Sequence, residues 1–186
     1  MIKTYCINLD SRRDRWADSQ RNHAAVGLPP QAVQRLPAVE DKQYGALGCT
    51  KSHVAALSHF LTHDSSPYCL ILEDDFDFHL PFAKVIETVN TLTDDRLDWD
   101  VLMLMGTLTT AARSHSPRVM RVIDSCSGAA YLVTRAYAPI LLGCIAESIP
   151  QMELLRNLQP QFLQDRLPMD VVWRRNRMGA YARVTR

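Results

Sequence analysis

The 186-residue sequence lacks several features that would assign it to a large functional class. It has no apolar run approaching the roughly 18 residues of a membrane-spanning helix. Its first residues have neither the apolar region nor the small-residue cleavage site of a secretory signal peptide. Lysine and arginine total 21 against 20 acidic residues, so the formal charge of +1 excludes a generally basic nucleic-acid-binding protein. We therefore expect a cytoplasmic protein that has no nucleic-acid partner.

Paired-cysteine and glycine-rich motifs are also absent. The five cysteines show no C-x-x-C spacing and most lie in apolar stretches, which predicts reduced core side chains rather than a disulfide framework. Neither G-x-x-x-x-G-K-[ST] nor G-x-G-x-x-G occurs, so the phosphate-binding loops of P-loop and Rossmann nucleotide-binding proteins are not present in recognisable form. No nucleophile elbow of a serine hydrolase appears either.

What is present is the composition of one ordered domain. Hydrophobic residues make up 47% of the chain and charged residues 22%, close to ordinary globular usage. Segments with strand and helix patterns alternate, which predicts a single α/β domain over residues 1–186, a sandwich with a mostly parallel mixed sheet and helices on both faces. Strands are expected at residues 3–9, 32–36, 68–72, 100–105, 128–134 and 180–184, and helices at 11–26, 47–63, 82–92, 137–146 and 169–177.

Local signals refine these boundaries. The pattern Ser11-Arg12-Arg13-Asp14 predicts a capping box at the start of the first helix. A turn is expected at residues 45–48, and loops at residues 113–117 and 148–168. The apolar run at residues 68–72 is continuous rather than alternating, as is typical of a strand that is buried on both faces.

Three polar clusters are expected at strand ends: residues 8–15, residues 73–77 and a turn around Ser127 and Gly128. Ligands of open α/β sheets bind beyond the carboxyl ends of the strands, so these clusters are candidate sites. Adjacent carboxylates at Glu73-Asp74-Asp75 repel one another unless a cation or solvent relieves the repulsion. A hard divalent cation, Mg²⁺ or Mn²⁺, suits such oxygen ligands, and the alternative is a solvated acidic turn.

Two further groups have open interpretations. The arginines of residues 8–15 lie beside a helix amino terminus, which favours a diphosphate, or they form exposed ion pairs along the helix. His53 follows a helix start and is an acid/base, a metal ligand or a hydrogen-bonded partner between sheet and helix.

Five short motifs follow one another along the chain from Ile2 to about Tyr181. They are Tyr5 to Asp10 with Asp14-Arg15, Gly45 to Cys49 with Ser52-His53, Leu70 to Asp75, Gly128 to Val133, and Pro168-Met169-Asp170. Taken in this order, they resemble glycosyltransferase family 25, which includes bacterial lipopolysaccharide galactosyl- and glucosyltransferases and is related to the collagen galactosyltransferases. Family members usually continue beyond the strand matching residues 180–184, so the resemblance implies a domain that is short at its C-terminus.

The resemblance implies a GT-A fold and roles for particular residues. Glu73 and Asp75 would bind Mn²⁺ or Mg²⁺, with Asp75 the best direct ligand. Asp170 would be the catalytic base, with helix capping as its alternative, and His53, the second catalytic candidate, would line the same cleft. The remaining residues are expected to contact the donor: Asn8, Asp10, Arg12 and Arg15 the uridine and phosphates, and Ser52, Asp74, Ser127 and Gly128 the rest of the cleft.

The activity so implied is inverting, metal-dependent transfer of galactose or glucose from a UDP-sugar to a hydroxyl group. The acceptor would be lipopolysaccharide, lipooligosaccharide or another surface glycan, either lipid-linked or a free oligosaccharide. Six arginines between Arg166 and Arg186 suit anionic lipid or a phosphorylated acceptor, which favours peripheral contact with the inner face of the cell membrane. The alternative is a catalytically decayed module of the same fold that binds a sugar nucleotide or a glycan.

Overall fold

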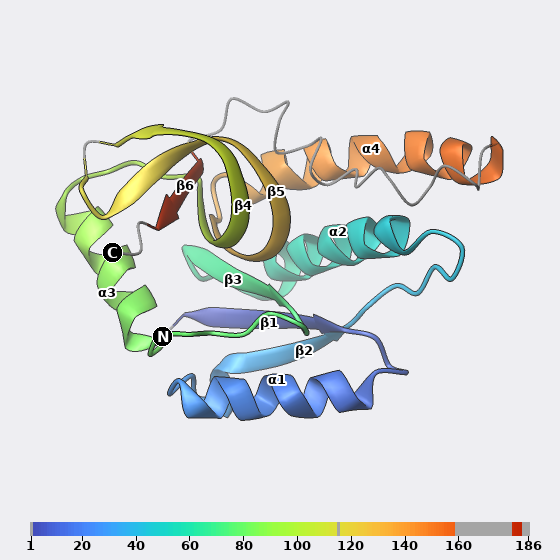
Figure 1. Ribbon diagram of the computed structural model, residues 1–186, viewed down its shortest axis with the longest axis horizontal. Helices are drawn as coiled ribbons and strands as arrows, with labels where there is room; N and C mark the ends of the chain where they lie inside the picture. The colour runs from blue at the N-terminus through green and yellow to red at the C-terminus, as the bar shows by residue number, and fades with distance from the viewer. Residues whose placement is uncertain (1, 115, 159–179, 184–186) are drawn as a thin grey trace.

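The protein folds around one mixed six-stranded sheet (Figure 1). The computed structural model describes residues 2–114, 116–158 and 180–183, and the side chains of these residues except 106–109, 124–127 and 180–183. The strands are β1 (Lys3–Asn8), β2 (Val33–Pro37), β3 (Tyr68–Glu73), β4 (Val101–Arg113), β5 (Val119–Thr134) and β6 (Ala180–Arg183). The helices are α1 (Arg13–Ala25), α2 (Gly45–His63), α3 (Ala83–Asp94) and α4 (Ala138–Leu158), with a short 3-10 helix at Pro30–Ala32.

The strand order is β2-β1-β3-β5-β4-β6. The pairs β1–β2, β1–β3 and β4–β6 are parallel, whereas β3–β5, β4–β5 and β5–β6 are antiparallel. The sheet is therefore mixed, as predicted, but it is not mostly parallel. The reason is that β4 and β5 are consecutive strands of one long hairpin, which forces them to run in opposite directions.

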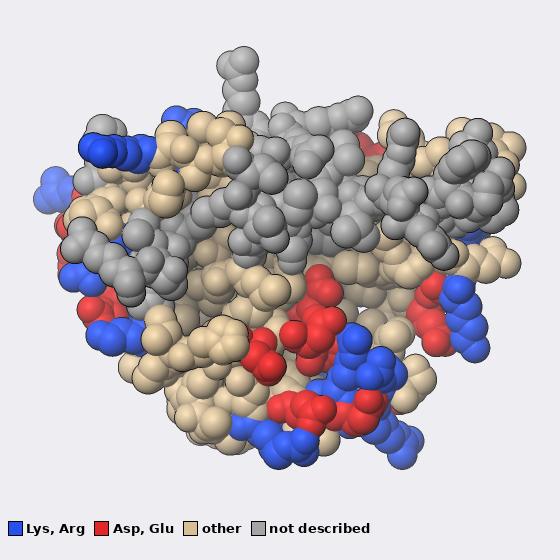
Figure 2. All heavy atoms as spheres, viewed as in Figure 1, with Lys and Arg blue, Asp and Glu red and all other residues tan. Residues whose placement is uncertain are grey.

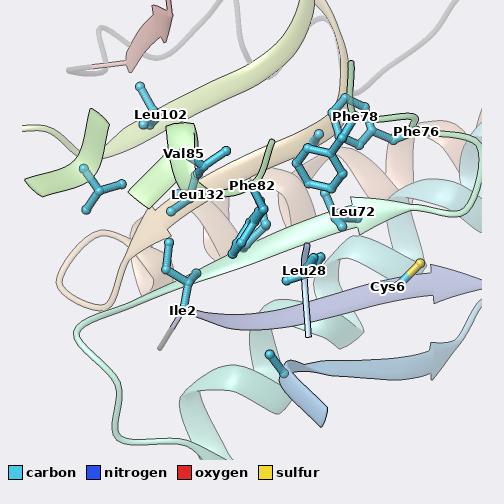
Figure 3. Close-up of a cluster of buried hydrophobic side chains, with 14 of the residues drawn as sticks. Ile2, Cys6, Leu28, Leu72, Phe76, Phe78, Phe82, Val85, Leu102 and Leu132 are labelled. Carbon is cyan, nitrogen blue, oxygen red and sulfur yellow. The ribbon is translucent and has the colours of Figure 1, made fainter. Parts of the chain in front are cut away.

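Helices cover both faces of the sheet, and alternate residues of β3 mark the two sides. Cys69 and Ile71 belong to a core formed with α2 and α4, while Leu70 and Leu72 belong to a second core formed with α1 and α3 (Figure 1). Figure 3 shows the second core, in which Phe76, Phe78 and Phe82 gather against the sheet. All four β3 side chains from Cys69 to Leu72 are fully buried, so the predicted burial of this strand on both faces is confirmed.

Several predicted boundaries are wrong, each for a local reason. Helix α1 begins at Arg13 behind a backbone turn from Leu9 to Arg12, and its N-cap residue Arg12 makes no capping hydrogen bond, so there is no capping box at Ser11. The turn before α2 lies earlier than residues 45–48, because Asp41 accepts hydrogen bonds from the backbone of Gln43 and Tyr44. Gly45 and Gly48 are consequently inside the first turns of the helix.

The hairpin and α4 are longer than the hydropathy pattern indicates. Strand pairing extends β4 through residues 106–113 and β5 through residues 119–127, where small and polar residues weaken the alternation. Residues 127 and 128 thus lie inside β5 and not in a turn. Helix α4 continues past Pro150 to Leu158, so the predicted loop at residues 148–168 is helical in its first part. The predicted helix at residues 169–177 lies outside the described residues.

Contrary to the expectation from the sequence, one described helix passes a length and composition test for a membrane span. This helix is α4, and 22% of its most apolar 18-residue stretch is buried inside the protein. Its inner side packs on α2 through Leu141 and Ile145, and an ion pair joins Lys51 to Glu153 at 2.6 Å. Ile140, Leu154 and Leu158 are exposed on the same helix.

Gly48 allows the chain between β2 and α2 to approach the helix. A Cβ atom at this position would lie 2.5 Å from the carbonyl oxygen of Val39 and 3.0 Å from the backbone nitrogen of Asp41. The neighbouring Ser52 hydroxyl holds the same segment, because it accepts a hydrogen bond from the Val39 amide at 2.8 Å.

We expect Gly48→Ala to lower the free energy of unfolding by about 1–3 kcal/mol, because the backbone contact must open. Gly143→Ala in α4 is the matched control, since a Cβ there would meet nothing within 4 Å, and it should stabilise by roughly 0.5–1 kcal/mol. Urea denaturation of both variants measures the difference. Equal stabilisation by the two substitutions would contradict the close approach.

Candidate functional site

The carboxyl ends of β1 and β3 meet the first turns of α2 around a cavity of about 260 Å³. Parallel pairing brings these two strand ends together, and residues 38–42 form another wall of the cavity. Figure 2 shows acidic and basic side chains gathered on this face, in the region where β1 and β3 end in Figure 1. Six of the polar or ionisable residues that line the cavity are Arg15, Cys49, Ser52, His53, Glu73 and Asp74.

Glu73, the last residue of β3, is held by two side chains of α2. Its Oε1 atom lies 3.2 Å from Nε2 of His53 and 3.7 Å from Sγ of Cys49. Burial opposes the charge on Glu73, but the hydrogen bonds from His53 and Cys49 and the nearby charges outweigh it, so the pKa of Glu73 is below its ordinary value. Glu73 is therefore a carboxylate at neutral pH, and one of its oxygens already has partners.

His53 belongs to α2 and is fully buried against the sheet. Its Nδ1 atom lies 3.0 Å from the hydroxyl oxygen of Tyr131 on β5, while its Nε2 atom faces Glu73. Of the three interpretations open from the sequence, this arrangement agrees with a partner between sheet and helix, and it also puts the imidazole at the wall of the cavity.

Asp74 is held by the end of β1 and by α1. Its Oδ2 atom accepts a hydrogen bond of 2.7 Å from Nδ2 of Asn8, and its Oδ1 atom lies 3.2 Å from Nη1 of Arg15. The side chain of Asp74 is only 10% exposed. Asn8 itself is buried and uses the rest of its amide as well, since Nδ2 also donates to the Arg12 carbonyl and Oδ1 accepts from Nε of Arg35.

Among the described residues, Asp75 has one side-chain partner, Nη1 of Arg15 at 3.1 Å, whereas Glu73 and Asp74 each have two. Its side chain is 51% exposed. Partial burial and the negative charge of Glu73 raise the pKa of Asp75, with a further contribution from Asp74, and Arg15 compensates only in part. Asp75 is thus the carboxylate of the three that most needs an additional cation.

The other predicted donor contacts fall into two groups. Arg12 is not among the residues that line the cavity and forms a forked ion pair with Asp14, whereas Asp10 is exposed and pairs with Arg35 at 2.6 Å. Arg15 faces the acidic residues from α1 and lines the cavity. The structure therefore brings Arg15 into the site and leaves Arg12 on the helix surface.

Ser52 lines the cavity from α2, whereas Gly128 belongs to β5 and is not among the residues that line it. Besides accepting from Val39, the Ser52 hydroxyl donates to the Gly48 carbonyl at 2.7 Å, so it holds the wall of the cavity. Gly128 is a buried position of β5, two residues before Ala130, which pairs with Leu72. The side chain of Ser127 and all of Asp170 lie outside the described residues.

Three residues of this region were not singled out in the sequence. Arg35 ends up beside Asn8 because β2 pairs in parallel with β1, so the rule that gathers strand ends could have found it. Asp41 precedes α2 and pairs with Arg156 of α4 at 2.8 Å, a long-range contact that leaves no local signal. Nothing in the sequence distinguishes Tyr131 from other strand residues, because only the packing of α2 on β5 brings its hydroxyl group to His53.

We expect Asp75→Asn to raise the thermal midpoint of the protein at pH 7. A raised pKa means that the ionised form of Asp75 opposes folding, and this loss of stability develops as the pH rises from the ordinary value of 3.8 through the raised pKa. Because the side chain is half exposed, the gain should be a few tenths of a kcal/mol, or roughly 1–2 °C.

Differential scanning calorimetry at pH 7 and below pH 3.8 measures this effect, which should vanish at the lower pH. Asp14→Asn is the opposite control, because the guanidinium of Arg12 lowers the pKa of Asp14 to about 2 and the substitution should destabilise at pH 7. Destabilisation by Asp75→Asn at pH 7 would show that the Arg15 pair outweighs the repulsion.

Comparison with known proteins gives no family assignment: no protein-family model matches the chain, and no curated protein is significantly similar to it. The similarity to glycosyltransferase family 25 therefore rests on the five short motifs alone.

Proposed function

We propose that the protein is a glycosyltransferase that moves galactose or glucose from a UDP-sugar to a hydroxyl group with the help of Mn²⁺ or Mg²⁺. The observation that carries this proposal is the half-exposed Asp75, with its raised pKa, directly after Glu73 and Asp74, which line a cavity at the carboxyl ends of parallel strands. Three of the five motifs similar to glycosyltransferase family 25 contribute residues to this cavity: Tyr5 to Asp10, Gly45 to Cys49 with Ser52-His53, and Leu70 to Asp75. The GT-A form of the α/β fold is part of the proposal.

A divalent cation would act on the leaving group of the transfer. When the bond from the sugar to the diphosphate breaks, negative charge builds up on UDP, and a bound cation stabilises that charge as a Lewis acid. Asp75 is the proposed direct ligand. Glu73 contributes the second negative charge close by, although its Oε1 atom is already engaged by His53 and Cys49.

Arg15 is the residue that we assign to the phosphates. Its guanidinium now bridges Asp74 and Asp75, and a bound cation would take over part of the neutralisation of these carboxylates. Arg15 can then turn its remaining donors to a diphosphate, a geometry that guanidinium groups suit well. The amino terminus of α1 lies directly before Arg15 and favours the same anion.

Direct displacement with inversion also needs a base that takes the proton from the acceptor hydroxyl. Asp170 remains the proposed base on the strength of the family resemblance. His53 has the different task of positioning Glu73, since both of its ring nitrogens lie within 3.2 Å of protein oxygen atoms.

The acceptor in this proposal is a lipid-linked or free surface glycan, with lipopolysaccharide as the leading case. Exposed Ile140, Leu154 and Leu158 on α4 support peripheral contact with the inner membrane face, because apolar side chains on a helix surface can enter the lipid interface.

We expect UDP and Mn²⁺ together to raise the thermal midpoint by roughly 5–10 °C at about a hundred times the dissociation constant, and each alone to give a much smaller shift. Asp75→Ala should abolish the joint shift. Asp77→Ala, an exposed carboxylate in the same loop, is the matched control and should keep it. No shift for the native protein, or a full shift in Asp75→Ala, would contradict the proposal.

Turnover separates an enzyme from a binding module. With a UDP-sugar, Mn²⁺ and no acceptor, the enzyme should release free sugar slowly, because water substitutes poorly for the natural hydroxyl. A joint shift without any release of sugar from UDP-galactose or UDP-glucose would favour the catalytically decayed module instead.

A further inference from the structure

We propose that Cys49, His53 and Glu73 form a binding site for a borderline or soft divalent cation, of which Zn²⁺ is the type, on the wall of the same cavity. This site differs in position and in ligand chemistry from the hard-cation site at Asp75. It does not depend on the proposed glycosyl transfer.

The spacing of the three ligand atoms is the first argument. Nε2 of His53 and Sγ of Cys49 lie 3.2 Å and 3.7 Å from Oε1 of Glu73, and all three atoms are within 4.8 Å of one another. A tetrahedral zinc ion with bonds of about 2.0–2.3 Å separates its ligand atoms by roughly 3.3–3.8 Å. The three ligand atoms therefore already lie close to the spacing that a zinc ion requires.

The elements that carry the ligands are rigid. Cys49 and His53 are four residues apart on α2, which places both on one face of the helix, and Glu73 ends the central strand β3. Residues Cys69 to Leu72 of β3 and the buried face of α2 belong to the folded core, so the three ligands are held without the help of a loop.

The surroundings of His53 give the second argument. A metal-bound histidine usually places its other ring nitrogen against a polar group that fixes the ring. Here the hydroxyl oxygen of the buried Tyr131 lies 3.0 Å from Nδ1, which leaves Nε2 directed at the other two ligands. Tyr131 is thus a positioning residue for the site.

The donor set selects the type of metal. A thiolate and an imidazole together prefer Zn²⁺ or Co²⁺, whereas Mg²⁺ prefers oxygen ligands alone. Binding would transfer the thiol proton of Cys49 to solvent and replace the hydrogen bonds to Glu73 by bonds to the metal. Three protein ligands leave the fourth tetrahedral position to water or a ligand, and all three residues line the cavity.

Cobalt(II) is a suitable probe of this site, because it binds in the place of zinc and its absorption spectrum depends on the ligands that coordinate it. Titration of the reduced, full-length protein with Co²⁺ should give one equivalent of tetrahedral d–d absorption and a near-ultraviolet charge-transfer band from the thiolate. Zn²⁺ should displace the cobalt and bleach both bands. The absence of a thiolate band at saturating Co²⁺ would overturn the proposal.

Three variants locate the site. Cys49→Ser should remove the charge-transfer band and weaken Co²⁺ binding more than about tenfold, whereas Cys144→Ser on α4 should leave both unchanged. Tyr131→Phe should keep the band but lower the affinity about 10–100-fold. A band that survives in Cys49→Ser would place the metal elsewhere and refute the assignment.

A measurement on the unaltered protein guards against a variant that fails to fold. Zn²⁺ should slow the alkylation of Cys49 by iodoacetamide, as followed by peptide mass spectrometry, and should leave that of Cys144 unaffected. Equal rates at Cys49 with and without Zn²⁺ would overturn the proposal. Because none of these experiments contains UDP or a sugar, their failure and the failure of the proposed transferase activity are distinguishable.

Discussion

Repulsion among three consecutive carboxylates at the end of β3 is the constraint around which the site is organised. Glu73, Asp74 and Asp75 follow a strand that is buried on both faces, so solvent reaches them only in part. The three carboxylates have different partners. Glu73 pairs with His53, and Asp74 is held by Asn8 and Arg15. Asp75 shares Arg15 with Asp74, and its side chain is half exposed. The remaining repulsion falls mainly on Asp75, whose pKa is raised although Arg15 pairs with it.

These contacts also connect the surrounding elements. The amide of Asn8 links β1 to the acidic residues, to the start of α1 and, through Arg35, to β2. On the other side, α2 approaches β3 closely enough for His53 to reach Glu73, and Gly48 lets residues 39–41 pack on the same helix. The polar centre and the two apolar cores therefore support the same arrangement of β1, β3 and α2.

The sequence predicts the parts of this arrangement that depend on local pattern. The continuous apolar run at residues 68–72 identifies the central buried strand, and the acidic residues after it predict the candidate site. Hydropathy does not reveal that residues 106–113 and 119–127 pair into a hairpin, because strand pairing acts between small and polar side chains with little alternation. For the same reason, residues 127 and 128 are predicted in a turn although they continue β5. The partners of the site residues are long-range contacts, as between His53 and Tyr131 or Asp41 and Arg156, and no spacing in the chain encodes them.

The proposed function depends on a hard cation binding at Asp75, among the three carboxylates. Crystals grown with Mn²⁺ and UDP would show the metal directly by its anomalous scattering. We expect a manganese peak coordinated by Asp75 and by the diphosphate oxygens, with Glu73 still paired to His53 and with Arg15 turned towards the phosphates. A manganese ion bound away from Asp75, or UDP bound at a site remote from β1 and β3, would contradict the central claim.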